Sequence, residues 1–266
     1  MRFNKPNIAR FFVALLALYG CQEAPTRLPA TATPTQAPAT AWVELGDGIE
    51  LQPIAPNGNR LAEMVTLRIN PRLVRFEAHY RPNAPLSLQG WRETLPDALA
   101  FVNANFFAPE YVVLGLLISD GTTYGQAYTE RGGTFFEDKS GNVGILENVR
   151  QALPTQSWRT AVQAFPMLVY DGLPTYANAR DARGSRRTVV GIDNEGRVLL
   201  MTTPGIGLGL YPLSQFLPTA ELGIQRAFNL DGGRSTMLWI QKTGYGIASF
   251  EPVPSVLALY RRADAP

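Results

Sequence analysis

The chain has 266 residues and a formal net charge of +2, so it lacks the basic excess typical of nucleic-acid-binding proteins. Hydrophobic residues make up 45% of the sequence, which is enough for a core, and the only cysteine is Cys21. The domain must therefore fold without disulfides. Together with a single histidine, His79, this scarcity argues against His- or Cys-based zinc sites and against Cys–His catalysis.

The first twenty residues have the pattern of a secretory signal peptide. Three basic residues precede an apolar run at positions 11–19, which is shorter than the ~20 residues that a membrane-spanning helix needs. The run ends at Leu18-Tyr19-Gly20-Cys21, which resembles the lipobox of bacterial lipoproteins, in which the cysteine is lipidated. An ordinary signal peptide with an incidental cysteine is the alternative.

The next segment, residues 21–41, is rich in Pro, Thr and Ala and has few bulky apolar side chains. Such a segment cannot bury enough surface to fold, and it predicts an extended tether. We therefore expect a signal peptide at 1–20, a tether at 21–41 and one folded domain at 42–262. The predicted location is the cell envelope, after secretion across the inner membrane, with a lipid on Cys21 as the membrane anchor.

The first half of the domain predicts mainly strands. Apolar and polar residues alternate at 65–69 and again at 74–80, which predicts a hairpin with one buried face. Ser87 is a typical N-cap for a short helix at 88–94, and Pro96 follows it. The apolar run at 98–102 predicts a buried strand that ends at Asn103, and another apolar run covers 112–118.

The second half continues the pattern. Hairpins are predicted for 132–137 with 143–146 and for 188–192 with 197–202, each around a polar turn. A strand is expected at 164–170, a second helix at 212–222 that Pro218 bends or ends, and a closing strand at 255–260. The expected fold is a single α+β domain, with mostly antiparallel or mixed β-sheet and few helices.

The stretch Ala227–Ile240 places a polar turn, residues 229–236, between two apolar runs. Asp-Gly between apolar runs is typical of a hairpin turn, which is one interpretation. The other is a functional site, because two glycines after Asp231 let a ligand approach the backbone. The turn also carries more polar groups than a plain turn needs, namely Asn229, Ser235 and Thr236.

Carboxylates are left to carry any acid–base step. There is no Gly-x-Ser-x-Gly sequence and no phosphate-binding glycine loop, so neither a serine-hydrolase elbow nor a nucleotide cofactor is indicated. His79 falls on the polar face of its strand, as a surface histidine would. Asp231 is the best candidate carboxylate, as in glycoside hydrolysis. Asp171, Glu110 or Glu221 could supply a second one.

Two further segments could contribute to a site. The loop at 180–187 carries four arginines, whose guanidinium groups suit phosphate oxygens, although a solvated charged loop is the plainer interpretation. Arg187 differs from the others because it opens an apolar strand. Asn103 ends a buried strand, and a buried amide needs hydrogen-bond partners, so it belongs in a polar network.

Three motifs together resemble the phosphodiester glycosidase family. They are Asn103-Ala-Asn-Phe-Phe107, Arg187-Thr-Val-Val-Gly-Ile192 and Asn229-Leu-Asp-Gly-Gly-Arg-Ser-Thr236, and the last is the most specific. Arg234 is a departure, because the family often has glycine there. It could narrow the pocket or add a phosphate contact.

The resemblance implies hydrolysis of a sugar-1-phosphodiester at the anomeric carbon, with a carbohydrate phosphodiester of an envelope or extracellular glycan as substrate. From the residues present we expect neither a cofactor nor a metal. The implied catalytic residues are Asp231, Arg187 and Asn103. The implied substrate-binding residues are Asn229, Gly232, Gly233, Ser235, Thr236 and Thr188. Two alternatives remain: a non-catalytic polysaccharide-binding lipoprotein, and a hydrolase acting on peptidoglycan or a teichoic-type polymer.

Overall fold

The computed structural model describes residues 41–263. The predicted signal peptide, the lipidation site at Cys21 and nearly all of the predicted tether lie outside these residues. Within the described part, no helix has the length and apolar character needed to cross a membrane. The fold prediction is confirmed: described strand pairs are antiparallel, and only two α-helices are present among residues 41–263.

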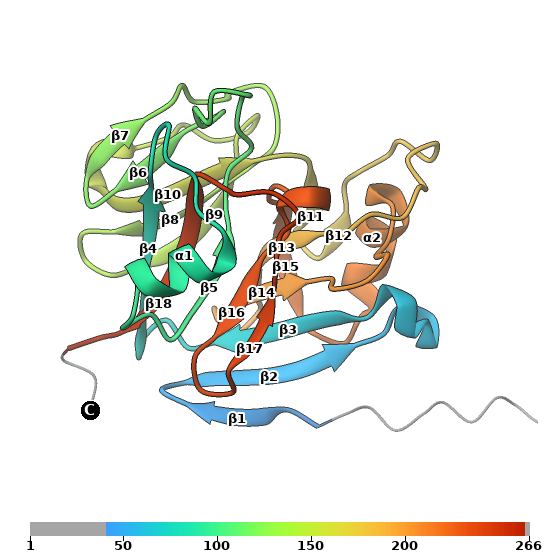
Figure 1. The fold of residues 1–266 in the computed structure, drawn as a ribbon. Helices are drawn as coiled ribbons and strands as arrows, with labels where there is room; N and C mark the ends of the chain where they lie inside the picture. The colour runs from blue at the N-terminus through green and yellow to red at the C-terminus, as the bar shows by residue number, and fades with distance from the viewer. Residues whose placement is uncertain (1–40, 264–266) are drawn as a thin grey trace, which may run out of the picture. The chain divides into compact units, whose positions relative to one another are not determined.

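The strands form three sheets (Figure 1). Sheet 1 has eight strands, in the spatial order β1 (Val43–Gly46), β2 (Ile49–Ile54), β3 (Met64–Ile69), β14 (Val198–Thr202), β13 (Thr188–Asp193), β15 (Ile224–Asn229), β11 (Met167–Tyr170) and β12 (Leu173–Pro174). Sheet 2 has five, in the order β7 (Thr122–Tyr124), β6 (Leu117–Ser119), β10 (Trp158–Ala164), β8 (Gly133–Asp138) and β9 (Val143–Glu147). Sheet 3 has five, in the order β17 (Tyr245–Ile247), β16 (Leu238–Ile240), β5 (Ala100–Asn103), β18 (Ser255–Arg261) and β4 (Val74–Tyr80).

The main core lies between the three sheets. Leu67 of sheet 1, Phe135 of sheet 2 and Phe76 of sheet 3 belong to one buried cluster, and the rings of Phe76 and Phe135 meet edge to face at 5.1 Å. A buried carboxylate also joins sheets 2 and 3. Glu137 is fully buried and accepts hydrogen bonds from the Phe76 N–H at 2.6 Å and from Arg159 Nη2 at 2.6 Å. Arg262 Nη2 donates a third, at 2.9 Å.

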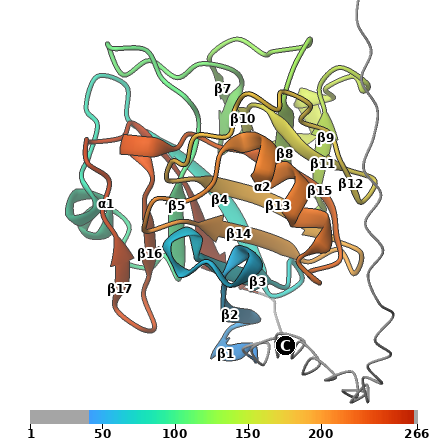
Figure 2. The ribbon, with the colours of Figure 1, turned by 90° about the vertical axis from the view of Figure 1, so that its right-hand side faces the viewer.

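Two short α-helices cover outer faces of sheets 1 and 3. Helix α1 (Leu88–Thr94) places Trp91 on sheet 3, and its N-cap Ser87 accepts a hydrogen bond from Gly90 N–H, so this prediction is confirmed. Helix α2 (Leu210–Phe216) packs on a face of sheet 1 (Figure 2), where the hydroxyl of Ser214 donates to the carbonyl of Leu168 in β11. It ends just before a 3₁₀ turn that contains Pro218, as predicted. The 3₁₀ turns are η1 (Pro56–Gly58), η2 (Arg60–Ala62), η3 (Thr155–Ser157), η4 (Leu217–Thr219) and η5 (Gly233–Ser235).

The prediction of a hairpin at 65–69 and 74–80 is wrong, although both strands exist. Strand β3 pairs with β2 and β14 in sheet 1, whereas β4 pairs with β18 in sheet 3. A turn at residues 70–73 carries the chain from one sheet to the other. Thr66, expected on a wet face, is fully buried, so β3 is covered on both faces. Alternation indicates a strand but not its partner, and that is why the pairing was missed.

Other local predictions had mixed outcomes. Strands β8 with β9 and β13 with β14 form the two predicted hairpins, and the buried strand β5 and closing strand β18 are also confirmed. The run at 112–118 is wrong as one buried element, because only 117–119 form a strand and Val112 is 46% exposed. Strands β1 and β2 and most of β10 were not predicted.

Candidate active site

The turn at 229–236 connects two different sheets. Strand β15 before it pairs with β11 and β13 in sheet 1, and β16 after it pairs with β5 and β17 in sheet 3. The two strands are not partners, so the turn is not the closing turn of a hairpin. It lies where the ends of β5, β13 and β15 meet, and these are the three places at which the sequence puts its polar motifs.

Both glycines of the turn are required by local geometry. A Cβ atom on Gly232 would lie 2.9 Å from the carbonyl oxygen of Arg186, which is closer than real Cβ contacts allow. Gly233 has a φ of +62°, in the left-handed region that glycine adopts most readily. Its N–H donates to the same Arg186 carbonyl at 2.8 Å. The Gly-Gly pair therefore holds the turn against the segment that leads into β13.

Asn103 is the hub of this junction. Its Nδ2 donates to the backbone oxygen of Asp231 at 2.7 Å. Its Oδ1 accepts from Thr188 Oγ1 at 2.7 Å and from the N–H of Met237 at 2.9 Å. One fully buried amide thus ties β5 to the start of β13 and to both sides of the turn. The expectation that Asn103 belongs to a polar network is met, through protein partners.

Asp231 is held firmly and is partly buried. Its N–H donates to the carbonyl of Ala104 at 3.0 Å, and its Oδ1 accepts from the N–H of Gly232 at 2.8 Å. Burial raises the pKa of the Asp231 carboxyl from 3.8 to about 6, and the negative charge of Glu251 adds to the rise. Hydrogen bonds from Ser235 and Gly232 act in the opposite direction but do not cancel the effect of burial.

Such a carboxyl exchanges its proton near neutral pH. A general acid or base works best when its pKa lies near the operating pH, which is the range reached by Asp231. Perturbed carboxyls of this kind occur preferentially at functional sites. The chemistry available at the turn is therefore proton transfer or nucleophilic attack by one carboxyl group.

The arginines of the 180–187 loop do not act as one group. Arg180 and Arg183 are exposed, as a solvated loop predicts. Arg186 is buried, and its Nη2 donates to the carbonyls of Thr236 at 2.8 Å and Ala248 at 2.9 Å. It therefore holds the end of the turn to the loop after β17. Sequence reasoning did not single out Arg186, because nothing in the sequence distinguishes it from the adjacent arginine.

Arg187 lies beside the turn, with its side chain anchored elsewhere. Its Cα would be 3.7 Å from a Cβ on Gly232, but its Nε donates to the carbonyl of Leu208 at 2.9 Å. Burial lowers the pKa of its guanidinium, and Asp181 and Tyr176 counteract this. Within residues 41–263 its terminal nitrogens make no hydrogen bond or ion pair, and none of its contacts is to Asp231.

The residues that the family resemblance assigns to substrate binding divide into two groups. Gly232 and Gly233 are partly exposed. Four side chains are at most 3% exposed, namely Thr188, Asn229, Ser235 and Thr236. In the buried group, Asn229 Oδ1 and Thr236 Oγ1 have no hydrogen-bond partner among the described residues. In this structure the accessible part of the site is Asp231 with its two glycines.

None of the three carboxylates considered as partners of Asp231 is placed well. Glu110, Asp171 and Glu221 are exposed on turns. Asp171 and Glu221 also flank the start of β15, at the opposite end of that strand from Asn229. Glu251, in the loop between β17 and β18, instead acts electrostatically on Asp231. Nothing in its sequence context distinguishes it, because the fold alone brings this loop to the turn.

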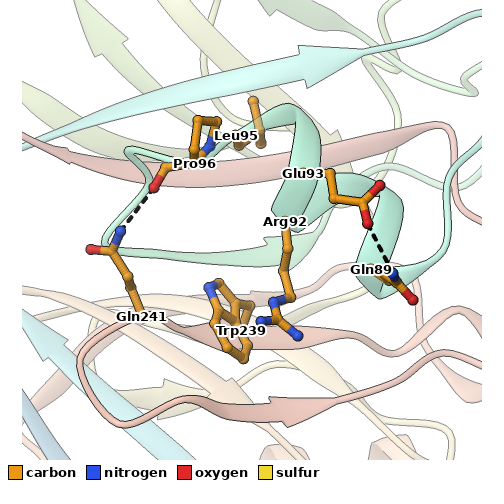
Figure 3. Close-up of a pocket in the computed structure, with 7 residues that line it drawn as sticks. All are labelled: Gln89, Arg92, Glu93, Leu95, Pro96, Trp239 and Gln241. Carbon is orange, nitrogen blue, oxygen red and sulfur yellow. Dashed lines mark hydrogen bonds between the residues drawn. The ribbon is translucent and has the colours of Figure 1, made fainter.

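A surface pocket of about 370 Å³ lies away from these residues, between α1 and β16 (Figure 3). The guanidinium of Arg92 covers the ring of Trp239 at 3.8 Å, and Gln241 donates to the carbonyl of Pro96. Because Arg92 occupies the accessible face of the indole, that face is not free to stack on a sugar ring. This pocket contains none of the predicted site residues.

The single histidine takes part in a different cluster. His79 is partly buried rather than a free surface residue, and its Nε2 lies 2.8 Å from the Tyr260 hydroxyl. Burial lowers its pKa, and Arg75 lowers it further. Within residues 41–263, no group of three or more His, Cys, Asp or Glu side chains could hold a metal ion.

Comparison with known proteins shows the family of the chain. The sequence profile of the phosphodiester glycosidase family matches residues 97–260, which is well over half of the chain and includes all three motifs. The chain belongs to the phosphodiester glycosidase family. No curated protein sequence matches the chain significantly.

Solved structures share the fold of this family member. The catalytic domain of zebrafish N-acetylglucosamine-1-phosphodiester alpha-N-acetylglucosaminidase, auto-inhibited by pro-peptide, superposes with a TM-score of 0.61 at 19% identity, over 86% of this chain and 85% of that one. A hypothetical protein from Synechocystis gives a TM-score of 0.57 at 16% identity, over 85% of this chain and 64% of that one. A Burkholderia pseudomallei protein described as exported gives 0.57 at 13% identity, over 74% of both chains. At these identities the likeness concerns the fold.

Proposed function

We propose that this protein is a hydrolase that cleaves a sugar-1-phosphodiester in an envelope or extracellular glycan. Its family membership supports glycosidase-type activity in general. The observation that carries the finer assignment is Asp231: its carboxyl, with a pKa of about 6, is held at a partly exposed Gly-Gly turn. The name of the zebrafish protein, an N-acetylglucosamine-1-phosphodiester alpha-N-acetylglucosaminidase, suggests the substrate class.

In the proposed net reaction, water supplies a hydroxyl to the anomeric carbon, and the bond from that carbon to the phosphate oxygen breaks. The products are the free sugar and a phosphomonoester. Phosphate leaves as a stable anion, so stabilisation of charge matters more than strong acid assistance. Asp231 acts as base for the water, as nucleophile, or by orienting the sugar hydroxyls. Asn103 is a positioning residue, because its hydrogen bonds hold the backbone of the turn.

Arg187 is proposed to bind the phosphate. Its Nε is fixed on the Leu208 carbonyl, which leaves the two terminal nitrogens of the guanidinium for an anion. A planar guanidinium pairs with two phosphate oxygens at once. Partial burial strengthens such a pair, because water screens it less. The buried polar atoms of Asn229 and Thr236 would reach the substrate only if the turn opens, so their proposed binding role depends on that movement.

The proposed location is the cell envelope, after secretion across the inner membrane, with the chain anchored by a lipid on Cys21. The motif at residues 18–21 and the tether-like composition of residues 21–41 support this. The carbohydrate phosphodiester and the membrane are the proposed partners. Metabolic labelling with a fatty-acid analogue, compared between the full chain and a Cys21→Ala variant, tests the anchor.

The function is tested by incubating the protein with glycosyl-1-phosphodiesters and with matched simple glycosides. Release of reducing sugar together with a ³¹P NMR signal for a phosphomonoester is the expected result for the phosphodiesters alone. Asp231→Asn should abolish release. Asp171→Asn is a matched control, because Asp171 lies on an exposed turn with a φ of +49° that asparagine also tolerates.

The outcomes separate the alternatives. Full activity of a folded Asp231→Asn protein would refute the role of Asp231. Saturable glycan binding without turnover, unaffected by that substitution, would favour a polysaccharide-binding protein. Turnover of peptidoglycan or a teichoic-type polymer in place of the phosphodiesters would refute the substrate class.

A further inference from the structure

The loop between β17 and β18 packs against the Asp231 turn of the candidate site. Its backbone is attached to the Asp231 turn, because the N–H of Phe250 donates to the carbonyl of Arg234 at 2.7 Å. Within the loop, Ser249 Oγ donates to the carbonyl of Glu251 at 2.6 Å. The ring of Phe250 covers the guanidinium of Arg186 at 4.7 Å. These contacts hold the backbone at Glu251 in place.

The side chain of Glu251 makes two contacts, both to the turn. Its Oε1 lies 3.2 Å from the hydroxyl of Ser235, and its Oε2 lies 3.2 Å from Nε of Arg234. Ser235 lies four residues after Asp231 on the same turn, and its hydroxyl lowers the pKa of the Asp231 carboxyl, as a hydrogen-bond donor does. The Ser235 hydroxyl therefore stands between two carboxyl groups, one from the turn and one from the loop.

We propose that Glu251 is the second carboxylate of this site, a positioning residue that acts on Asp231 through the Ser235 hydroxyl and through its own negative charge. This inference rests on the proposed function and adds a residue to it. Arg234, the departure from the family pattern, is assigned to holding Glu251 rather than to binding phosphate.

The chemistry follows from the hydrogen-bonding capacity of a hydroxyl. Ser235 has one proton to donate and lone pairs with which to accept. When it donates to Glu251, its oxygen can accept only from a protonated Asp231. When Asp231 is ionised, Ser235 can donate to Asp231 and leave Glu251. The chain Asp231–Ser235–Glu251 thus links the protonation of Asp231 to the direction of one hydrogen bond.

The negative charge of Glu251 also favours the protonated form of Asp231. A second negative charge nearby favours the protonated form of a carboxyl, and Glu251 has this effect on Asp231. The neighbouring cations point elsewhere: Arg186 to the carbonyls of Thr236 and Ala248, Arg187 to that of Leu208, and Arg234 to Glu251. The pair between Arg234 and Glu251 is 68% and 37% exposed, so it orients Glu251 and adds little stability.

The test measures Asp231 directly, by ¹³C NMR titration of its carboxyl carbon in the folded protein without substrate. In Glu251→Gln the pKa of Asp231 should fall from about 6 by roughly half a pH unit to one pH unit, because a nearby like charge is lost. Glu110→Gln, which removes an exposed glutamate, should leave it unchanged. Ser235→Ala keeps the Glu251 charge but removes the hydroxyl that lowers the pKa of Asp231, so there the pKa should rise.

The result that overturns the proposal is an Asp231 pKa that is the same in Glu251→Gln and in the wild type. If Glu251→Gln does not fold, the Ser235→Ala titration decides alone, and an unchanged or lower pKa there refutes the bridge. If hydrolysis is detectable, the acidic limb of kcat/KM should move to lower pH in Glu251→Gln. A shifted Asp231 pKa in a protein that cleaves no phosphodiester would refute the proposed function but support the coupling.

Discussion

Replacing Asp231 by asparagine should stabilise the protein at alkaline pH while removing its activity. The carboxyl has a pKa of about 6 in the folded protein, against its ordinary value of 3.8, which we take for the unfolded chain. The folded state therefore binds this proton more tightly. Between pH 4 and pH 6 the folded protein carries more protons than the unfolded one, so its stability decreases as pH rises through this window.

The size of the effect follows from the shift of the pKa. A difference of one pH unit corresponds to about 1.4 kcal/mol, so the ionised Asp231 costs the folded state up to about 3 kcal/mol at pH 8. Below pH 4 the cost is absent, because the group is protonated in both states. Asparagine carries no charge, and its Oδ1 can still accept the hydrogen bond from the Gly232 N–H. We expect Asp231→Asn to be more stable than the wild type at pH 8, by about 1–3 kcal/mol, with little difference at pH 4.

Urea unfolding at pH 4, 6 and 8, followed by tryptophan fluorescence and circular dichroism, measures this difference. Asp171→Asn is again the control, because its exposed carboxylate lies on a turn and should contribute little at any pH. A stability difference between Asp231→Asn and the wild type that does not grow from pH 4 to pH 8 would refute the reasoning. It would mean that the folded protein accommodates the Asp231 charge as well as water does.

Two further predictions concern the supports of the site and of the sheets. Asn103→Ala should destabilise the protein by about 3 kcal/mol or more, because it leaves the Thr188 hydroxyl and two backbone groups buried without partners. Urea unfolding measures this change in stability. A loss below about 1 kcal/mol would contradict the role of Asn103 as a hub. Glu137→Gln should lower the free energy of unfolding by about 3 kcal/mol, because Arg159 and Arg262 lose a buried charged partner. The melting temperature should fall, while kcat per folded molecule stays unchanged. An unaltered melting temperature would refute the network.

Local structure followed largely from local sequence. The helix at Leu88–Thr94, the hairpins built from β8 with β9 and β13 with β14, and the helix end before Pro218 depend on capping, alternation and proline. Each of these acts over a few residues, so a single sequence contains the information. The run at 112–118 failed because an apolar stretch does not reveal whether its residues face a core or solvent, and Leu114 is 40% exposed.

The candidate site was predictable only in part. The Asn229–Thr236 motif and its relation to Asn103 followed from motif content and family resemblance, and the hydrogen bond from Asn103 to Asp231 agrees with it. The direction of the Arg187 side chain and the role of Glu251 were not predictable. Both depend on loops that are distant in sequence, and their composition does not indicate what they meet.

What the sequence by itself determined is the inventory: strands, two short helices, one carboxylate at a Gly-Gly turn, and too little histidine and cysteine for other catalytic groups. What only the tertiary structure decided is which strands are partners. It separates β3 from β4 and β15 from β16, and so converts two apparent hairpins into crossings between sheets. The alternation of apolar and polar residues shows which face of a strand is buried but not which strand lies beside it. Neighbouring strands are joined by backbone hydrogen bonds, and these do not depend on side-chain identity. The turn at Asp231 is part of a site because it lies at one of these crossings, where the ends of three strands share one buried amide.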